Sequence, residues 1–321
     1  MPPGGSHRRG VGHDGPVTTL TDAAAHFDEH GWVLVPGLVP TPDIDAALPQ
    51  LFRLYPTPEE VASGERTPRT APFLNADVDE GGRRFRAQQF SGLRDAPTGD
   101  PALDTLALHH RILDLVEALL GTADIRLYQA ETFAKYSGAA DYEQPLHVDE
   151  TNHTLVPPRR DGGYRQVQLF LYLSDVTEER GATRVVSRQI TSAVPRGDVV
   201  LHQAGRVRLD EHEVAAVGPA GSVLAYSADT VHRGAAMTEP GAGRFFFNLA
   251  YRPAGIDWVG ALPWPRRGID PAMTGWIEAL DLRQLLAVGF PPPGHPYWDE
   301  ETLAATADRY PNLDLEPFAL R

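Results

Sequence analysis

The residues of this chain with the clearest chemical potential are His147, Asp149 and His232, and Arg244 follows His232 by twelve positions. On an extended segment, residues i and i+2 point to the same side, so the imidazole of His147 and the carboxylate of Asp149 can converge on one ion. The imidazole of His232 would complete a 2-His-1-carboxylate triad. That ligand set leaves positions open on iron(II) for a bidentate 2-oxo acid and oxygen, although zinc also accepts these ligand types.

A short His-x-Asp motif also arises by chance, and His-Asp pairs often serve as structural hydrogen bonds, so the surrounding sequence has to support the metal interpretation. Alternating or β-rich composition predicts strands at 127–135 and 166–173, on either side of the motif. A strand at 221–226 precedes His232, and the aromatic run 244–251 predicts the strongest strand of the chain. We therefore expect the triad to lie among strands.

Alternation along 244–251 places Arg244 on the pocket side and puts the apolar face Phe245, Phe247, Leu249 and Tyr251 outward against helices. An inward arginine implies an anion, because burying an unpaired charge is unfavourable by several kcal/mol. Its planar fork can grip a carboxylate with two hydrogen bonds, which suits the distal carboxylate of 2-oxoglutarate. The alternative is an exposed arginine on a surface strand.

Other polar and aromatic side chains on the inward faces extend this hypothesis. We assign co-substrate contacts to Arg244, Thr183 and Gln129, and prime-substrate contacts to Gln168, Phe170, His153 and Asn248. The competing interpretation is that alternating polar residues face solvent and that His153 is a surface residue. Lys135, the single lysine, shares a strand face with Gln129, and we expect its amine to be solvated.

These motifs together resemble the phytanoyl-CoA dioxygenase family of Fe(II)/2-oxoglutarate-dependent oxygenases. The resemblance spans roughly residues 20 to 255, and the matching segments are 27–39, 145–149, 171–176, 179–183, 231–234 and Arg244. The sequence departs from the family pattern after Thr183, where residues 185–189 are Val-Val-Ser-Arg-Gln in place of the usual Pro-Gly-Ser-His. Arg244 also lies slightly farther from His232 than is usual, and the Gly/Pro-rich turn 238–243 accommodates the difference.

The resemblance implies a mainly β fold with flanking helices, built on a double-stranded β-helix core of the jelly-roll, cupin-like kind. It also implies iron(II) as cofactor, with 2-oxoglutarate and O2 as co-substrates for the oxidation of a small molecule. Because the carboxylate of Asp149 is present, hydroxylation or a related oxidation is favoured over halogenation, for which the family opens a halide position at this site. Two alternatives stay open, a cupin-like metalloenzyme without a 2-oxo acid and a non-catalytic binding protein.

Composition predicts one domain at 17–321 after a disordered tail at 1–16, with the β-helix core at about 125–255 and a Trp/Pro-rich C-terminal extension at 256–321. The absence of cysteine favours a cytoplasmic protein. The net charge of −14 disfavours nucleic-acid binding, because the phosphate backbone would be repelled. No apolar stretch reaches the roughly 18 to 20 residues of a membrane span.

Several segments are interpreted as structural support. We expect a helix that opens at Thr21 and closes at Gly31, and an amphipathic helix over 103–120 on which His109 and His110 are structural. The segment 56–100 is either a lid or surface padding. The tryptophans of the C-terminal extension should pack against the β core or a partner subunit, so a homodimer is a further hypothesis.

Overall fold

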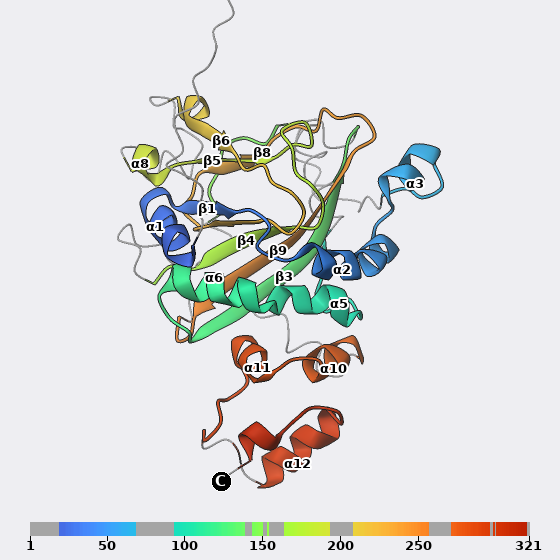
Figure 1. Ribbon diagram of the computed structural model, residues 1–321, viewed down its shortest axis with the longest axis vertical. Helices are drawn as coiled ribbons and strands as arrows, with labels where there is room; N and C mark the ends of the chain where they lie inside the picture. Colours follow the sequence, from blue (N-terminus) through green and yellow to red (C-terminus); the bar gives the residue numbers. More distant parts are fainter. Residues whose placement is uncertain are drawn as a thin grey trace, which may run out of the picture.

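The computed structural model describes residues 19–68, 93–138, 143–149, 153, 164–192, 208–256, 271–295, 298 and 300–319. Their strands form two antiparallel sheets (Figure 1). The larger sheet has the order β1-β7-β4-β9-β3-β2, with β1 at Trp32–Val35, β7 at Val223–Tyr226, β4 at Val167–Tyr172, β9 at Gly243–Pro253, β3 at Ile125–Tyr136 and β2 at Arg94–Asp95. The smaller has the order β6-β5-β8, with β6 at Glu213–Ala215, β5 at Thr183–Val186 and β8 at His232–Gly234.

The predicted mainly β architecture with flanking helices is confirmed. Strands of both sheets line one cavity, so the two sheets enclose the interior between them in the jelly-roll manner. Among the described residues the strands stay in two separate sheets and do not close into a barrel.

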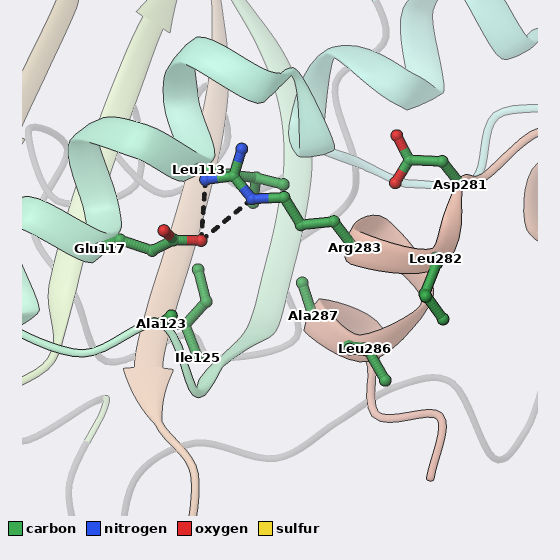
Figure 2. Close-up of a pocket in the computed structure, with 9 residues that line it drawn as sticks. All are labelled: Leu113, Glu117, Ala123, Ile125, Asp281, Leu282, Arg283, Leu286 and Ala287. Carbon is green, nitrogen blue, oxygen red and sulfur yellow. Dashed lines mark hydrogen bonds and ion pairs between the residues drawn. The ribbon is translucent and has the colours of Figure 1, made fainter. Parts of the chain in front are cut away.

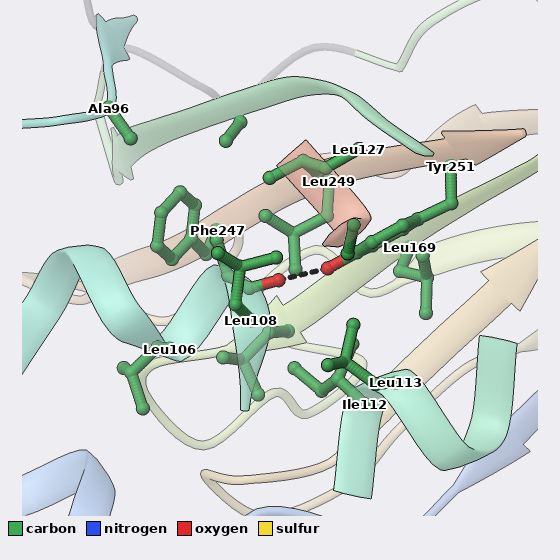
Figure 3. Close-up of a cluster of buried hydrophobic side chains, with 14 of the residues drawn as sticks. Ala96, Leu106, Leu108, Ile112, Leu113, Leu127, Leu169, Phe247, Leu249 and Tyr251 are labelled. Atoms are coloured by element: carbon green, nitrogen blue, oxygen red, sulfur yellow. Dashed lines mark hydrogen bonds between the residues drawn. The ribbon is translucent and has the colours of Figure 1, made fainter. Parts of the chain in front are cut away.

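The outer face of the larger sheet carries the main hydrophobic core, as alternation predicted. Phe247, Leu249 and Tyr251 of β9 are fully buried there against helix residues such as Ile112 and Leu113 (Figure 3). Each such side chain contributes about 1.5 to 3 kcal/mol through its burial. The phenol of Tyr251 donates a hydrogen bond to the carbonyl of Ala107, which ties β9 to the helical layer. This packing fixes which face of β9 is left for the interior.

The predicted helix over 103–120 is wrong in its continuity. The segment divides into α5 (Pro101–Asp104), the 3-10 helix η1 (Thr105–Leu108) and α6 (His110–Leu120). His109 leaves the helical conformation and accepts a hydrogen bond from the backbone N–H of Arg111, so it caps α6. Its Nε2 lies 3.2 Å from Asp43, and His110 lies 2.8 Å from Asp281. The structural interpretation of both histidines is therefore consistent with their contacts.

The N-terminal helix α1 (Leu20–His30) begins two residues earlier than expected. Thr19, not Thr21, is its cap, because Thr19 accepts from the N–H of Asp22 while the Asp22 carboxylate accepts from the N–H of Thr19. Gly31 ends the helix at φ 80° as predicted. Before residue 257 the described residues also form α2 (Thr41–Leu54), α3 (Pro58–Ser63), α8 (Arg188–Thr191) and the 3-10 helix η2 (Leu209–His212).

The described part of the C-terminal extension packs on its own chain. It contains α10 (Pro271–Glu278), α11 (Leu282–Val288), α12 (Glu300–Arg309) and the 3-10 helix η4 (Glu316–Phe318). Arg283 of α11 forms an ion pair with Glu117 of α6 beside a cavity of about 520 Å³ (Figure 2). It forms a second ion pair with Asp114 of the same helix. None of the predicted site residues lines that cavity. The homodimer stays a prediction.

Some expectations fall on other parts of the chain. The tail 1–16 and residues 69–92 of the 56–100 segment lie outside the described residues, and the rest of that segment includes α3 and β2. Within the described part, no helix combines the length and apolar character needed to cross a bilayer.

Candidate metal centre

The structure brings His147, Asp149 and His232 together. One donor atom from each residue lies within 4.8 Å of the other two. The Nε2 atom of His232 is 3.4 Å from Oδ2 of Asp149, and that of His147 is 3.8 Å from Oδ1 of Asp149. Ligands about 2.1 Å from one metal and at right angles stand about 3 Å apart, so small rotations would bring these three atoms onto a common ion.

Backbone contacts orient both imidazoles for coordination. Nδ1 of His147 lies 2.8 Å from the carbonyl of Pro145, and Nδ1 of His232 lies 3.0 Å from the carbonyl of Thr230. A carbonyl only accepts, so each Nδ1 carries a proton and donates, which leaves each Nε2 as the atom that can bind a metal. This pattern, with the distal nitrogen donating to an acceptor, is the usual support of a metal-binding histidine.

The His-x-Asp motif is held by a bridge and not by a regular strand, which differs from the extended strand that we expected. His147 and His232 exchange two backbone hydrogen bonds of 3.0 and 2.9 Å in an isolated antiparallel bridge at β8. The N–H of Asp149 then donates to the carbonyl of Ala228 at 3.0 Å. These backbone bonds to His232 and Ala228 thus fix His147 and Asp149 in position relative to His232.

Asp149 lies in an environment that keeps it ionised. Burial raises its pKa, but the nearby imidazoles of His232, His147 and His153 and a hydrogen bond from Tyr226 outweigh burial and lower the pKa below its usual value. The Tyr226 hydroxyl lies 3.2 Å from Oδ2 of Asp149 and 3.2 Å from Oε1 of Gln168. Sequence reasoning missed Tyr226, although its position as the inward polar end of the strand before His232 was a usable signal.

A cavity of about 440 Å³ opens beside the triad. Its lining includes every residue that the sequence predicted for the site: His147, Asp149, His153, Gln168, Phe170, Gln129, Thr183, His232, Arg244 and Asn248. They come from β3, β4, β5, β8 and β9 and from the 143–153 segment. Strand alternation therefore located the cavity face of the larger sheet correctly.

The register of the larger sheet arranges the cavity floor in cross-strand rows. Gln129 of β3, Ala250 of β9 and Gln168 of β4 form one row, which continues to Tyr226 of β7 at the metal end. The next rows hold Glu131, Asn248 and Phe170, and then Phe133, Phe246 and Tyr172. The last row pairs Lys135 with Arg244. The floor thus runs from amide and acid groups through an aromatic band to two cations.

Arg244 and Thr183 line the same cavity as the three candidate metal ligands. Arg244 is 2% exposed, and its guanidinium lies 4.7 Å from the ring centroid of Phe246. Thr183 of β5 is buried and pairs with Gly234, two residues after the ligand His232. Gln129 stands in the row of Gln168, six residues along β3 from Lys135, the partner of Arg244. Its predicted co-substrate contact is therefore limited to the end of the 2-oxo acid that lies near the metal ligands.

The residues predicted for the prime substrate face the same space. Phe170 stacks on Phe246 with ring centroids 5.2 Å apart. Gln168 is 1% exposed, and Asn248 stands between Glu131 and Phe170 in its row. Nδ1 of His153 lies 3.0 Å from the Tyr128 hydroxyl, and burial lowers the pKa of His153. Their roles stay predictions.

The expectation that the Lys135 amine is solvated is wrong. Lys135 is 6% exposed and lines the cavity, and burial together with the charge of Arg244 lowers its pKa to about 7. The alternation that put Gln129 inward also puts Lys135 inward, but the general preference of lysine for the surface misled the interpretation. Glu131, another unassigned member of this face, accepts a hydrogen bond of 2.8 Å from Gln129, and burial raises its pKa.

The donor set suits a divalent iron or a similar ion. Two imidazole nitrogens and one carboxylate oxygen lie within 4.8 Å of one another beside the cavity, and the side chains of Lys135 and Arg244 lie at the far end of its floor. Such a mixed nitrogen and oxygen set is the ligand preference of non-haem iron.

The sequence model described as Phytanoyl-CoA dioxygenase (PhyH) matches residues 27–244, about two thirds of the chain, including all three candidate ligands and Arg244. The chain belongs to the phytanoyl-CoA dioxygenase family. A search among curated proteins found no match.

The solved structures of similar fold include proteins described as dependent on alpha ketoglutarate or as bound to it. The epimerase SnoN in complex with Fe3+, alpha ketoglutarate and nogalamycin RO is 21% identical, with a TM-score of 0.52 over 73% of this chain and 84% of that chain. The alpha ketoglutarate dependent carbocyclase SnoK from nogalamycin biosynthesis is 20% identical, with a TM-score of 0.50 over 75% and 87%. HygX from Streptomyces hygroscopicus, with nickel and 2-oxoglutarate bound, is 18% identical, with a TM-score of 0.50 over 73% and 87%. At these identities the likeness establishes the fold.

Proposed function

We propose that this protein is an Fe(II)/2-oxoglutarate-dependent oxygenase that hydroxylates a small molecule and releases succinate and CO2. The observation that carries the proposal is the meeting of the three ligands, with both Nε2 atoms turned toward Asp149, beside a cavity that ends in two cations. Family membership supports the same assignment.

His147, Asp149 and His232 would hold the metal, and Arg244, with Thr183 beside it, would hold the distal carboxylate of 2-oxoglutarate. Bound iron(II) would supply the activation of O2 coupled to decarboxylation of the 2-oxo acid. The chain itself supplies orientation, since the carbonyls of Pro145 and Thr230 fix the imidazoles and Tyr226 fixes the carboxylate. The aromatic band of Phe133, Phe170 and Phe246 keeps water from the middle of the floor.

Hydroxylation is the simplest outcome for this ligand set. Asp149 occupies the third protein position, so no vacant position favours a halide. SnoN and SnoK, named as an epimerase and a carbocyclase, have the same fold. The ligand set is equally compatible with those outcomes, so product analysis has to distinguish hydroxylation from them.

The amide and acid end of the floor supports a polar prime substrate. Gln129, Glu131, Gln168 and Asn248 present amide and carboxyl groups there, and such groups are stabilised when a ligand pairs with them. We therefore propose a substrate rich in hydroxyl or amine groups, contacted also by Phe170 and His153. We further propose that 17–321 fold as one domain, because ligands from distant parts of the chain meet in one site, and that the protein acts in the cytoplasm.

Anaerobic titration tests the co-substrate assignment directly. The protein loaded with Fe(II) should develop the weak visible charge-transfer band of a 2-oxo acid chelate when 2-oxoglutarate is added, and air should then release succinate. Cupin-like chemistry without a 2-oxo acid, or a binding protein, would give no band. A substrate panel scored by succinate release would then find the substrate class.

The variant Asp149→Ala tests the role of the carboxylate in the same titration. The variant keeps the fold contacts of the two histidines and loses the anionic ligand, so we expect weak Fe(II) binding and no succinate release. Unchanged turnover in the variant would remove Asp149 from the mechanism.

A further inference from the structure

Lys135 is the single lysine of the chain and stands inside the cavity. It is directly opposite Arg244 in the pairing of β3 with β9, and directly opposed residues of an antiparallel pair point to the same face. Both side chains are buried, at 6% and 2% exposure. Two permanent or potential cations therefore share one end of the floor.

The Lys135 amine crosses from the larger sheet to the smaller one. A Cβ atom placed on Gly234 would lie 3.2 Å from Nζ of Lys135 and 2.9 Å from Oε1 of Gln144, so the amine occupies the space above Gly234. Gly234 pairs with Thr183 and follows the ligand His232 by two residues on the same face of β8. The amine thus lies among Arg244, Thr183 and the strand that carries a metal ligand.

The charges around this amine favour an anion. Within the described residues, Lys135 forms no salt bridge to a carboxylate, and the charge that acts on its pKa is the like charge of Arg244. Gln144 does not neutralise it, and its Oε1 already accepts a hydrogen bond of 2.7 Å from the N–H of Gly234. Two buried cations side by side repel each other, and a ligand carboxylate placed between them would stabilise both.

We propose that Lys135 is a second cationic donor to the distal carboxylate of the 2-oxo acid, beside Arg244. One carboxylate oxygen would accept from the guanidinium and the other from the ammonium. The pocket should then discriminate strongly for a dicarboxylic 2-oxo acid over a monocarboxylic one of the same length. This inference rests on the proposed function, since it concerns the same co-substrate.

Anaerobic titration of the Fe(II) protein with two acids of equal chain length tests the inference. We expect Lys135→Met to raise the Kd for 2-oxoglutarate by about 10- to 100-fold, the loss expected for one charged hydrogen bond. The Kd for 2-oxovalerate, which chelates identically but lacks the distal carboxylate, should stay within about twofold of the wild-type value, as expected for a ligand that never reached this residue. Arg208→Met, which removes one positive charge at an exposed site, is the matched control and should change neither Kd.

Each outcome separates the two proposals. If the wild-type protein forms no chelate with either acid, the proposed function fails. If the wild-type protein binds 2-oxoglutarate and Lys135→Met binds it equally well, or loses both acids equally, the role of Lys135 is overturned and the oxygenase assignment stands.

A second measurement needs no variant, because the chain offers one side-chain amine. An amine-reactive acylating reagent, followed by peptide mass spectrometry, reports on Lys135 separately from the N-terminus. We expect Fe(II) with 2-oxoglutarate under anaerobic conditions to slow acylation of Lys135 and Fe(II) with 2-oxovalerate to slow it less. Equal protection by the two acids would contradict a contact with the distal carboxylate.

Discussion

Replacement of Lys135 by methionine should stabilise the metal-free protein at neutral pH. The amine is buried beside Arg244, and its pKa falls from 10.5 to about 7 through burial first and the arginine charge second. Methionine fills a similar volume as an unbranched chain without a charge, so the packing of the stem is largely kept. The substitution therefore removes the free-energy penalty of burying this amine, which either stays charged in the folded state or loses its proton on folding.

The size of the effect depends on pH in a defined way. Above pH 10.5 the amine is neutral in both states, and Lys135 carries no charge penalty. Between pH 10.5 and about 7 the unfolded chain binds a proton that the folded chain does not. The free energy of unfolding therefore falls by about 1.4 kcal/mol for each unit by which the pH is lowered. Below about pH 7 the amine has lowered the free energy of unfolding by its full amount, about 5 kcal/mol. This amount is the upper limit of the stability that Lys135→Met can restore.

Urea unfolding of the metal-free wild type and Lys135→Met at pH values from 6.5 to 9.5 measures this difference. We expect the variant to be more stable at pH 6.5 and the advantage to shrink steadily toward pH 9.5. Arg208→Met, at an exposed site, should show no pH-dependent gain of this kind. A variant that is less stable than wild type at pH 6.5, or a difference that does not change with pH, would refute the assignment of a buried, destabilising amine.

Two further substitutions test the supports of the site. Tyr226→Phe removes the hydroxyl that donates to Asp149 and should weaken Fe(II) affinity by about 10-fold in a competition with a chelating dye, while unchanged affinity would show that the contact does not tune the ligand. Gly234→Ala places a methyl group 2.9 Å from Oε1 of Gln144 and 3.2 Å from Nζ of Lys135, so it should raise the Kd for 2-oxoglutarate. Gly275→Ala, whose Cβ meets open space, is its matched control, and an equal effect of both alanines would contradict the crowding argument.

The metal centre and the faces of the strands could be predicted from sequence because both depend on local spacing. The ligands His147, Asp149 and His232 carry their chemistry in their residue types, and alternation along 244–251 assigned Arg244 to the interior and Phe247 to the helical layer. The supporting contacts could not be predicted in this way. Tyr226 reaches Asp149 because the N–H of Asp149 bonds to the carbonyl of Ala228, two residues after Tyr226, and that contact joins segments far apart in the chain.

The errors arise where an average preference of a residue type, or of a spacing pattern, is overridden by another feature of the chain. Lysine favours solvent on average, yet Lys135 is held inward by the same alternation as its strand neighbours. The apolar spacing of 103–120 favours one helix, yet His109 leaves the helix and caps the next one while it contacts Asp43. For Lys135 the deciding feature is the alternation of its strand, and for His109 it is the cap that this residue forms on α6.

A bulge in β3 changes the direction of one side chain, that of Tyr128, at the rim of the metal site. The pairing of β3 with β9 shifts between Leu127 and Gln129, so Tyr128 has no partner across the strands. Strict alternation would turn Tyr128 away from the side of Gln129, but a bulge rotates the local chain and can re-aim a side chain. The Tyr128 hydroxyl consequently reaches His153, whose imidazole in turn helps to lower the pKa of Asp149. One unpaired residue in the strand thus connects the polar end of the floor to the metal ligands.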